Sequence, residues 1–167
     1  MNITAKDIIQ RFKLQAHPEG GYFTETYRSG LAFDNPAVKN TYKTQHCAGT
    51  AIYYLLTSGT FSAMHRVASD EIFHFYLGDA VEMLQLLPDG SGKNISIGTD
   101  INTGQQPQVL VPAGSWQGCR LAEGGKFALM GCTVAPGFEF EDFQMADREQ
   151  LIRKYPDFKK DILQLTK

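Results

Sequence analysis

Cysteine is scarce in this sequence, and long apolar runs are absent. The 167 residues include 3 cysteines, an odd number without a Cys-x-x-Cys spacing. Free thiols in a reducing compartment are the simplest interpretation, so we expect a cytoplasmic protein without a disulfide framework. No stretch approaches the roughly 20 apolar residues that span a bilayer. Residues 1–7 also lack the basic and apolar regions of a secretion signal, in line with that location.

An excess of charge of either sign is also lacking. The 16 Lys+Arg residues nearly balance the 18 Asp+Glu residues, for a net charge of -2. Such a balance recruits neither nucleic acid nor an anionic membrane surface. We therefore expect a small-molecule ligand that is selected by a local pocket. The length and the 43% hydrophobic content are typical of one folded domain over residues 1–167.

Turn signals divide the chain into short segments. Thr4 and Asp7 resemble a helix N-cap pair ahead of apolar residues at helical spacing, and residues 17–21 should end that helix. A strand-like alternation covers residues 22–29, and a loop is expected over 31–44. A last helix should begin at Asp147, with Pro156 interrupting it before residues 158–165. Further strands are expected over residues 51–56, 71–77, 80–87, 94–97, 108–111, 115–121 and 127–134.

The spacing of glycine, histidine and glutamate in the middle of the chain is distinctive. Gly59, His65, Glu71 and Gly78 are separated by five, five and six residues, and residues 112–117 form a second, shorter motif. The two stretches resemble the two signatures of the cupin superfamily. That resemblance implies an all-β fold, the cupin double-stranded β-helix or jelly-roll barrel, here with an N-terminal helix and a C-terminal helical segment. The short, evenly spaced strands independently favour a sandwich or jelly roll.

A narrower resemblance covers nearly the whole chain. The chain resembles a family of single-domain cupins, the domain of unknown function 985, through residues 17–22, 50–55, 65–66, 71, 74, 116–117 and 136–143. Members of that family resemble sugar-nucleotide 3,5-epimerase barrels more than metal-dependent oxygenases, and no established reaction comes with the group. The resemblance implies a homodimer and a ligand that is a sugar or nucleotide-like.

The residues at the metal-ligand positions of cupins do not suit a metal here. Val67 occupies the position of the second histidine, and Gln117 that of the third. A divalent cation, if bound, would have only His65, Glu71 and Gln117 as ligands, and this set makes a weak site. We therefore expect no resident cofactor. His74 is a further candidate contact, although strand alternation from Glu71 turns it away from the pocket unless a bulge intervenes.

His65 and Glu71 form a candidate catalytic acid–base pair. A carboxylate beside an imidazole fixes its tautomer and supports its protonated form, which suits proton transfer near neutrality. By resemblance to the epimerases, His65 would be the base that removes a proton from a sugar carbon. The alternative is a structural pair whose members satisfy each other in a polar cavity.

The neighbours of these two residues are candidate ligand contacts. Gln117 can both donate and accept hydrogen bonds. Arg66 suits a phosphate or carboxylate at the mouth of the barrel, or else lies exposed or bridges a dimer. Trp116 should face away from Gln117, which favours a core or dimer contact over stacking on a ligand. Cys119 should be an apolar filler on the face of Gln117 rather than a reactive thiol.

Two outer segments are interpreted from their alternation. Residues 138–143 alternate phenylalanine with acidic residues, as an edge strand with a solvated charged face would. Tyr22 is a further candidate ligand contact. Its strand face should also carry Thr24, Thr26 and Arg28, with Glu25 and Tyr27 on the opposite face.

Three functions are consistent with these candidates. The leading hypothesis is metal-independent proton transfer, of the isomerase or epimerase type, on a sugar or nucleotide-sugar. The second is a ligand-binding or sensing module without turnover. The third is a divalent-metal enzyme of the oxygenase kind that uses His65, Glu71 and Gln117, with or without His74. Solvent-deuterium incorporation distinguishes the first two hypotheses, and metal analysis distinguishes the third.

Overall fold

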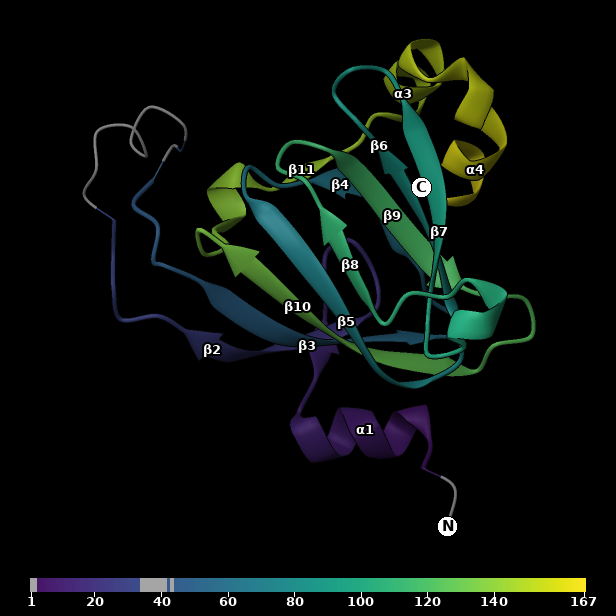
Figure 1. Cartoon of the computed structure of the whole chain (residues 1–167). Coiled ribbons are helices and arrows are strands. Elements are labelled where there is room, and N and C mark those ends of the chain that lie inside the picture. Colours follow the sequence, from purple (N-terminus) through teal and green to yellow (C-terminus); the bar gives the residue numbers. More distant parts are fainter. Residues whose placement is uncertain (1–2, 34–41, 43) are drawn as a thin grey trace.

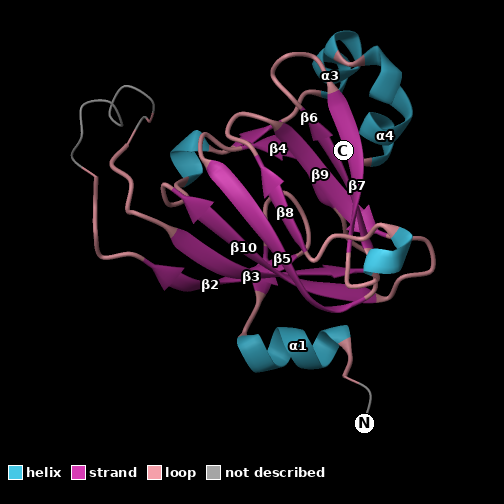
Figure 2. Ribbon diagram, in the orientation of Figure 1, coloured by secondary structure: helices cyan, strands magenta, loops and turns pink. Residues whose placement is uncertain are grey.

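The computed structural model describes residues 3–33, 42 and 44–167 (Figure 1). Two antiparallel sheets face each other and enclose an apolar interior, which is the jelly-roll arrangement that the sequence predicts. The α-helices lie toward the two ends of the chain, outside the sheets (Figure 2). The loop predicted over 31–44 lies largely outside the described residues. Within the described ranges, no helix has the length and apolar character needed to cross a membrane.

Each sheet draws its strands from distant parts of the chain. The first sheet has the order β1-β2-β3-β10-β5-β8, and the second has the order β11-β4-β9-β6-β7. The strands of the first sheet are β1 (Gln15–Ala16), β2 (Tyr22–Arg28), β3 (Thr50–Thr57), β5 (Asp70–Gly78), β8 (Gln108–Val111) and β10 (Phe127–Ala135). Those of the second are β4 (Ser62–Arg66), β6 (Val81–Leu86), β7 (Gly92–Ile97), β9 (Trp116–Leu121) and β11 (Gln144–Met145). Short 3-10 turns are η1 (Ile101–Thr103), η2 (Phe140–Asp142) and η3 (Pro156–Phe158).

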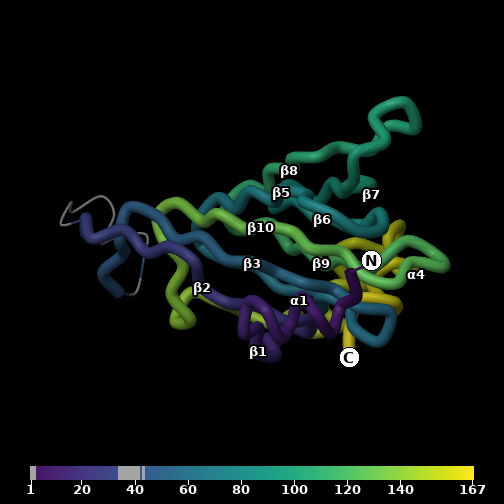
Figure 3. Tube along the Cα trace, turned by 90° about the horizontal axis from the view of Figure 1, so that it is seen from below, coloured from purple at the N-terminus to yellow at the C-terminus, as the bar shows by residue number. Residues whose placement is uncertain are grey.

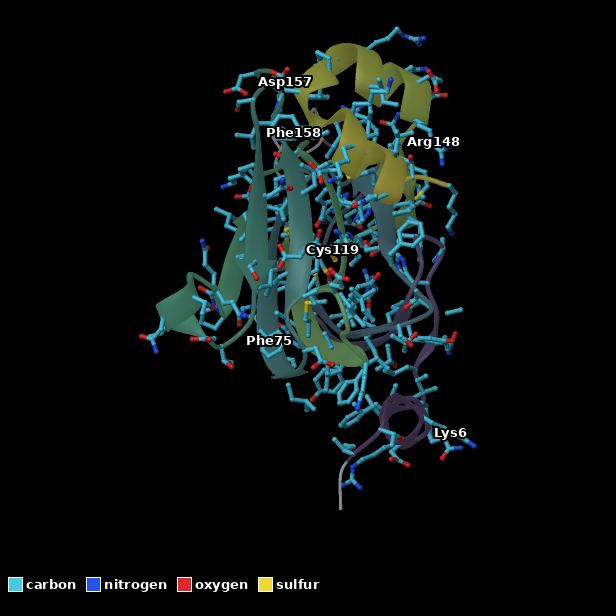
Figure 4. The ribbon with its side chains drawn as sticks, turned by 90° about the vertical axis from the view of Figure 1, so that its right-hand side faces the viewer. Lys6, Phe75, Cys119, Arg148, Asp157 and Phe158 are labelled. Carbon is cyan, nitrogen blue, oxygen red and sulfur yellow. The ribbon has the colours of Figure 1, made fainter. Side chains whose placement is uncertain are left out.

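The main core lies between the two sheets, because alternate residues of each strand point inward. Figure 4 shows Cys119 in this interior. Cys119 is fully buried, and burial together with the charges of Glu19 and Glu71 raises the pKa of its thiol. The prediction of an apolar filler at this position is therefore confirmed. The other large side chains buried in this core include Tyr54, Leu56, Phe73, Met83 and Met130.

Helix α1 (Ala5–Phe12) covers part of the outer face of the first sheet. The predicted N-cap is confirmed: the Thr4 side chain accepts from the backbone of Asp7, whose carboxylate accepts the Thr4 N–H at 2.9 Å. Ile8 packs against Leu55 and Leu129 of the sheet. Figure 3 shows α1 from below, next to β2 and β3.

Helices α3 (Arg148–Lys154) and α4 (Lys159–Gln164) cover the outer face of the second sheet (Figure 4). Asp147 caps α3 as predicted, because its side chain accepts the N–H of Gln150 at 2.8 Å. Leu84 and Leu86 of β6 point outward into a second core, where they meet Ile162 and other apolar residues of these helices. The second sheet therefore separates two apolar interiors.

Candidate functional site

A cavity lies at one end of the space between the sheets. It contains about 710 Å³ of empty space, a figure that includes open solvent at its mouth, and its apolar walls with a few polar groups are typical of small-molecule sites. Its buried floor carries His17, Glu19, His65, Glu71 and Cys132, and its mouth carries Glu25, Arg28 and Glu139. Its walls are mainly apolar: Phe23, Ile52, Tyr54, Val67, Phe73, Val134, Phe138, Phe140 and Phe143.

Strand β4, which the sequence analysis did not predict, brings both Ser62 and His65 to the floor by means of a bulge. Against β9, Ser62 pairs with Cys119 and His65 pairs with Gln117, so β4 uses one residue more than its partner. Cys119 and Gln117 both point inward, and cross-strand partners share a face of the sheet. Regular alternation would have placed Ser62 and His65 on opposite faces.

Glu19 reaches the floor from the tight turn between β1 and β2. The His17 carbonyl accepts the Gly20 N–H at 3.0 Å, and Gly20 adopts a φ of 119°, a region that favours glycine. The Glu19 carbonyl accepts the Ala63 N–H at 3.0 Å, which ties this turn to β4. Glu19 was not predicted as a site residue, and the signal that could have indicated it is the glycine pair that follows it.

Both ring nitrogens of His65 have partners. Nδ1 lies 2.8 Å from the Ala63 carbonyl, and because a carbonyl only accepts, Nδ1 carries a proton. Nε2 lies 3.2 Å from Gln117 Nε2 and 3.2 Å from Glu19 Oε2. In the neutral ring Nε2 accepts from the Gln117 amide, whereas in the charged ring it donates to the Glu19 carboxylate. His65 Nε2 therefore has one hydrogen-bond partner for its neutral form and another for its protonated form.

Glu19 is buried and nevertheless ionised. Burial raises its pKa, but the charge of His65 and hydrogen bonds from His17 and Ser62 outweigh burial and lower that pKa to about 2. Ser62 Oγ donates to Oε1 at 2.7 Å. His17 Nδ1 lies 3.3 Å from both Glu19 Oε2 and the Glu19 backbone nitrogen. Since that N–H only donates, His17 Nδ1 accepts it when the ring is neutral, and the hydrogen bond from His17 to the Glu19 carboxylate forms only when the ring is protonated.

Glu71 has the opposite tendency. Burial raises its pKa, and the charge of His65 and hydrogen bonds from Cys132 and Gln117 oppose that rise only in part. The Cys132 thiol donates to Oε1 at 2.6 Å, and Gln117 Nε2 makes a short contact with Oε2. Burial and the charge of Glu71 raise the pKa of the Cys132 thiol, which therefore stays protonated. Two carboxyl groups with pKa values pushed apart are the usual arrangement of a site with separate acid and base roles.

Arg28 reaches the mouth because β2 also carries a bulge. Glu25 pairs with Ile52 and Arg28 pairs with Thr50, so both side chains face the cavity although they are three residues apart. Arg28 Nε and Nη2 donate to Glu25 at 3.1 and 2.9 Å, and Nη1 donates to Glu139 at 2.6 Å. Hydrogen bonds to these two carboxylates raise the pKa of Arg28, which remains fully charged.

Three phenylalanines cover the cavity from the segment around η2. The ring centroids of Phe138, Phe140 and Phe143 lie 5.0, 6.2 and 6.4 Å from one another, and that of Phe143 lies 5.2 Å from the His65 ring. The rings therefore place apolar surface directly beside the candidate base.

The solvated edge strand predicted over residues 138–143 is wrong. The segment contains the 3-10 turn η2, and two of its acidic residues are engaged within the fold. His46 Nε2 lies 2.6 Å from Asp142, and its Nδ1 contacts the Gly137 carbonyl, while Glu139 pairs with Arg28. Alternation suggested a strand, but the aromatic residues instead fold over the cavity, and Glu139 and Asp142 make contacts within the fold.

Two predicted ligand contacts lie on the outer face of the first sheet. His74 is hydrogen-bonded there to Thr133 and Gln108, at 3.1 and 3.2 Å, as strand alternation from Glu71 predicts. Tyr22 packs on the outer face near α1. The prediction that Tyr22 shares a face with Arg28 is wrong, because the bulge in β2 reverses the alternation between them.

The other predicted contacts lie around the floor without lining the cavity. Gln117 lies just beneath it and touches both His65 and Glu71. Trp116 faces the second core, as predicted, with the Arg66 guanidinium 4.6 Å from its ring centroid. Arg66 also donates a hydrogen bond to Gln144 at 2.8 Å, so the contacts of its guanidinium group lie outside the cavity.

The fold and its enclosed pocket define a cupin. Solved structures of oxalate decarboxylase from Bacillus subtilis are similar to this chain, with a TM-score of 0.54 at 13% identity for one of them. That match covers 90% of this chain and 36% of the other chain, and at this identity it shows the shared fold alone.

The chain belongs to the family described as Cupin superfamily (DUF985), whose model matches residues 6–146. It is 31% identical over 145 residues to the uncharacterized protein YML079W of Saccharomyces cerevisiae, covering 82% of this chain and 72% of that protein. A hypothetical protein from Leishmania major matches with a TM-score of 0.88 and 31% identity over 98% of this chain and 99% of the other. Protein SO0799 from Shewanella oneidensis matches with a TM-score of 0.88 and 34% identity over 99% of both chains.

Oxalate decarboxylase from Bacillus subtilis has Mn(II) centres, but the side chains of this pocket offer few ligands for a metal ion. Gln117 directs its NH2 group, which cannot ligate, toward both His65 and Glu71. Val67, at the second histidine position, offers no lone pair. Among the described residues, no group of three or more His, Cys, Asp or Glu side chains is arranged to hold a metal ion. The residues present therefore do not fit a cupin metal centre.

Proposed function

We propose that this cupin binds a small ring compound of the sugar type and transfers a proton on it, as an isomerase or epimerase does, without a metal ion. The observation that carries the proposal is the position of His65 between two alternative partners. Its Nε2 lies 3.2 Å from Gln117 and from the ionised Glu19, so the ring can take up a proton and hold it.

The reaction uses only proton transfers. In the open-chain form of the sugar, His65 Nε2 removes a proton from the hydroxyl-bearing carbon next to the carbonyl group, and the C–H bonding pair becomes a C=C bond. Glu71, which burial keeps protonated to a higher pH than usual, gives its proton to the carbonyl oxygen and leaves an enediol. His65 then returns its proton to the former carbonyl carbon, and Glu71 takes the proton from the hydroxyl group of the carbon first attacked, which becomes the new carbonyl group. This completes an isomerisation, with both side chains returned to their starting states.

The placement of the two groups favours a shift between neighbouring carbons over inversion at one carbon. The Gln117 amide nitrogen touches both His65 and Glu71, so the base and the acid lie on one side of the cavity. A proton shift along a bond needs one base on one face of the ligand, with the acid beside the carbonyl oxygen, whereas inversion needs groups that act on the carbon from opposite faces. These contacts support the isomerase form of the proposal.

A binding module without turnover is the second candidate. It is supported by the hydrogen bonds that the polar residues on the floor of the cavity already make within the protein. His65, Glu19 and Glu71 each have hydrogen-bond partners within the protein, as the members of a structural pair would. In that case the cavity would bind a ligand whose protons never exchange.

Solvent-deuterium incorporation tests the proposal. The protein is incubated in D2O with a panel of aldoses, ketoses and nucleotide-sugars, and label on carbon is followed by NMR. We expect incorporation into at least one compound and a rate about 10²- to 10⁴-fold lower in His65→Ala. His74→Ala, which changes a histidine on the outer face, should leave the rate unchanged. A ligand that binds without any exchange would favour the binding module.

Metal analysis of protein purified without chelator tests the remaining alternative. We expect no stoichiometric transition metal. Stoichiometric iron, nickel, manganese or zinc that is lost in His65→Ala would contradict the proposal and favour a metal-dependent enzyme.

A further inference from the structure

Carboxylates outnumber cations in the cavity. Among the described residues that line the cavity, Glu19 on the floor and Glu25 and Glu139 at the mouth face one permanent cation, the Arg28 guanidinium, and two histidine rings, His17 and His65. Glu19 is 6% exposed, so water screens its charge poorly. While the two histidine rings are neutral, the cavity therefore carries an excess of negative charge, although the whole chain is nearly balanced in charge.

The guanidinium group of Arg28 already makes hydrogen bonds within the protein. Each of its three guanidinium nitrogens donates within the protein: Nε to Glu25, Nη1 to Glu139, and Nη2 to Glu25 and to the Phe138 carbonyl at 3.2 Å. A phosphate that took over these donors would leave two carboxylates unpaired beside it. Such an arrangement of like charges rejects anionic ligands.

The apolar part of the cavity reinforces this selection. Phe23, Phe138, Phe140 and Phe143 line it. The faces of aromatic rings attract cations. Rings and carboxylates on the walls of one cavity are the combination that binds a substituted ammonium group.

We propose that the ligand of this cavity carries a protonated amine and that the cavity rejects ligands carrying phosphate or pyrophosphate. The ring framework of the ligand rests on the proposed function, but the charge selection does not, because it would operate equally in a binding module. Within the class of sugar-like ligands, the structure favours an amino sugar over a nucleotide-sugar.

Three matched probes test this selection: D-glucosamine, D-glucose and D-glucose 1-phosphate, titrated by NMR at neutral pH and low salt, where imidazole rings are mostly neutral. We expect glucosamine to bind about tenfold more tightly than glucose, which corresponds to about 1.4 kcal/mol. We expect glucose 1-phosphate to bind at least about tenfold more weakly than glucose. Added salt should reduce the advantage of glucosamine, since a half-open mouth is partly screened.

One substitution should reverse the order of the probes. Glu25→Gln removes a carboxylate and frees Nε and Nη2 of Arg28, so glucosamine should lose affinity and glucose 1-phosphate should gain it. Glu123→Gln, an exposed change in the turn before β10, should leave all three affinities unchanged. The thermal midpoint of each variant shows whether it folds.

The outcomes separate this proposal from the proton-transfer reaction. Equal binding of the three probes, tighter binding of the phosphate, or no binding of glucosamine would overturn the charge selection. Preferential binding of glucosamine without deuterium exchange in any ligand would support the charge selection and contradict the reaction. Deuterium exchange confined to phosphorylated sugars would support the reaction and overturn the charge selection.

Discussion

Glu19 and Glu71 differ because of their neighbours rather than their depth. Both are nearly fully buried, at 6% and 7% exposure. Glu19 accepts a hydrogen bond from Ser62 and lies against two imidazole rings, whereas Glu71 faces a thiol and an amide. The charge of His65 acts to lower the pKa of both groups, but burial and the charge of Glu19 raise the pKa of Glu71, so only Glu19 has a pKa below its usual value. The two residues should therefore affect the pH dependence of stability in opposite directions.

Glu19→Gln should destabilise the protein at neutral pH. The pKa of Glu19 is about 2 in the folded protein and 4.5 without its neighbours, so its contribution is complete above about pH 4.5 and is lost as the pH falls toward 2. At about 1.4 kcal/mol per pKa unit, the contribution is on the order of 3 kcal/mol. Urea unfolding from pH 7 to about pH 3 measures it. Glu123→Gln is the exposed control, and parallel curves for Glu19→Gln and the wild type would contradict the prediction.

Glu71→Gln should show the reverse trend. Because burial raises the pKa of Glu71, the unfolded chain ionises above about pH 4.5 while the folded protein keeps the proton. The wild type therefore loses stability as the pH rises toward the folded pKa, and the neutral glutamine does not. We expect the free energy of unfolding of the variant, relative to wild type, to increase from acidic to neutral pH in the same urea series. A decrease over that interval would show that Glu71 is ionised when folded.

The candidate site was predicted only in part at the level of residues. His65, Glu71 and Gln117 do meet, because the spacing of the cupin signatures reflects where the strands lie. Glu19 could not be found by the same reasoning, since strand alternation says nothing of a turn. The position of Glu19 depends on the hydrogen bond from the Ala63 N–H to its backbone carbonyl. This contact joins distant segments of the chain, and no local sequence pattern reveals it.

At the level of elements, bulges decide which residues face the cavity. Alternation from Glu71 correctly places Phe73 inward and His74 outward, because β5 is regular up to Phe75. In β2 the same reasoning fails for Arg28, which lies beyond a bulge. A bulge depends on the pairing with the neighbouring strand, so the sequence of one strand alone does not predict it. The strands themselves were predicted well, apart from β4 and the short β1 and β11.

The turn that carries Glu19 should be sensitive to substitution. Gly20 has a φ of 119°, and a Cβ there would overlap the Phe61 carbonyl oxygen. We expect Gly20→Ala to lower the free energy of unfolding by about 1–3 kcal/mol or more. Ligand binding should also be lost, because the substitution displaces Glu19. Gly59→Ala is a matched control, since its Cβ would meet no heavy atom within 4 Å. Equal stability of the two variants in urea would contradict the prediction.

At the level of the whole molecule, the second sheet has an apolar interior on each side. The cavity and Phe73 belong to one interior, and the C-terminal helices close the other. The sequence predicted a jelly roll and a helical C-terminal segment, but not the surface on which that segment packs. That surface is formed by residues of β4, β6 and β9 that come together only in the folded protein.

The second interior should contribute stability without affecting the ligand. Ile162 of α4 is fully buried, so Ile162→Ala should cost about 2–5 kcal/mol of unfolding free energy. Leu163→Ala, at a neighbouring position that is 46% exposed, should change it by less than about 0.5 kcal/mol. Ligand affinity, measured well below the unfolding transition, should be unchanged in both variants. A large loss of affinity in Ile162→Ala would show that the two interiors are coupled.

Strand β6 contributes to both interiors, with Met83 in the core between the sheets and Leu84 beneath the C-terminal helices. Substitutions at alternate positions of one short strand therefore act on different properties of the protein. During evolution, a descendant could acquire a new ligand through changes on one side while the other side buffers the accompanying loss of stability. Such a division would let members of one family diverge widely in what they bind while they keep a common architecture.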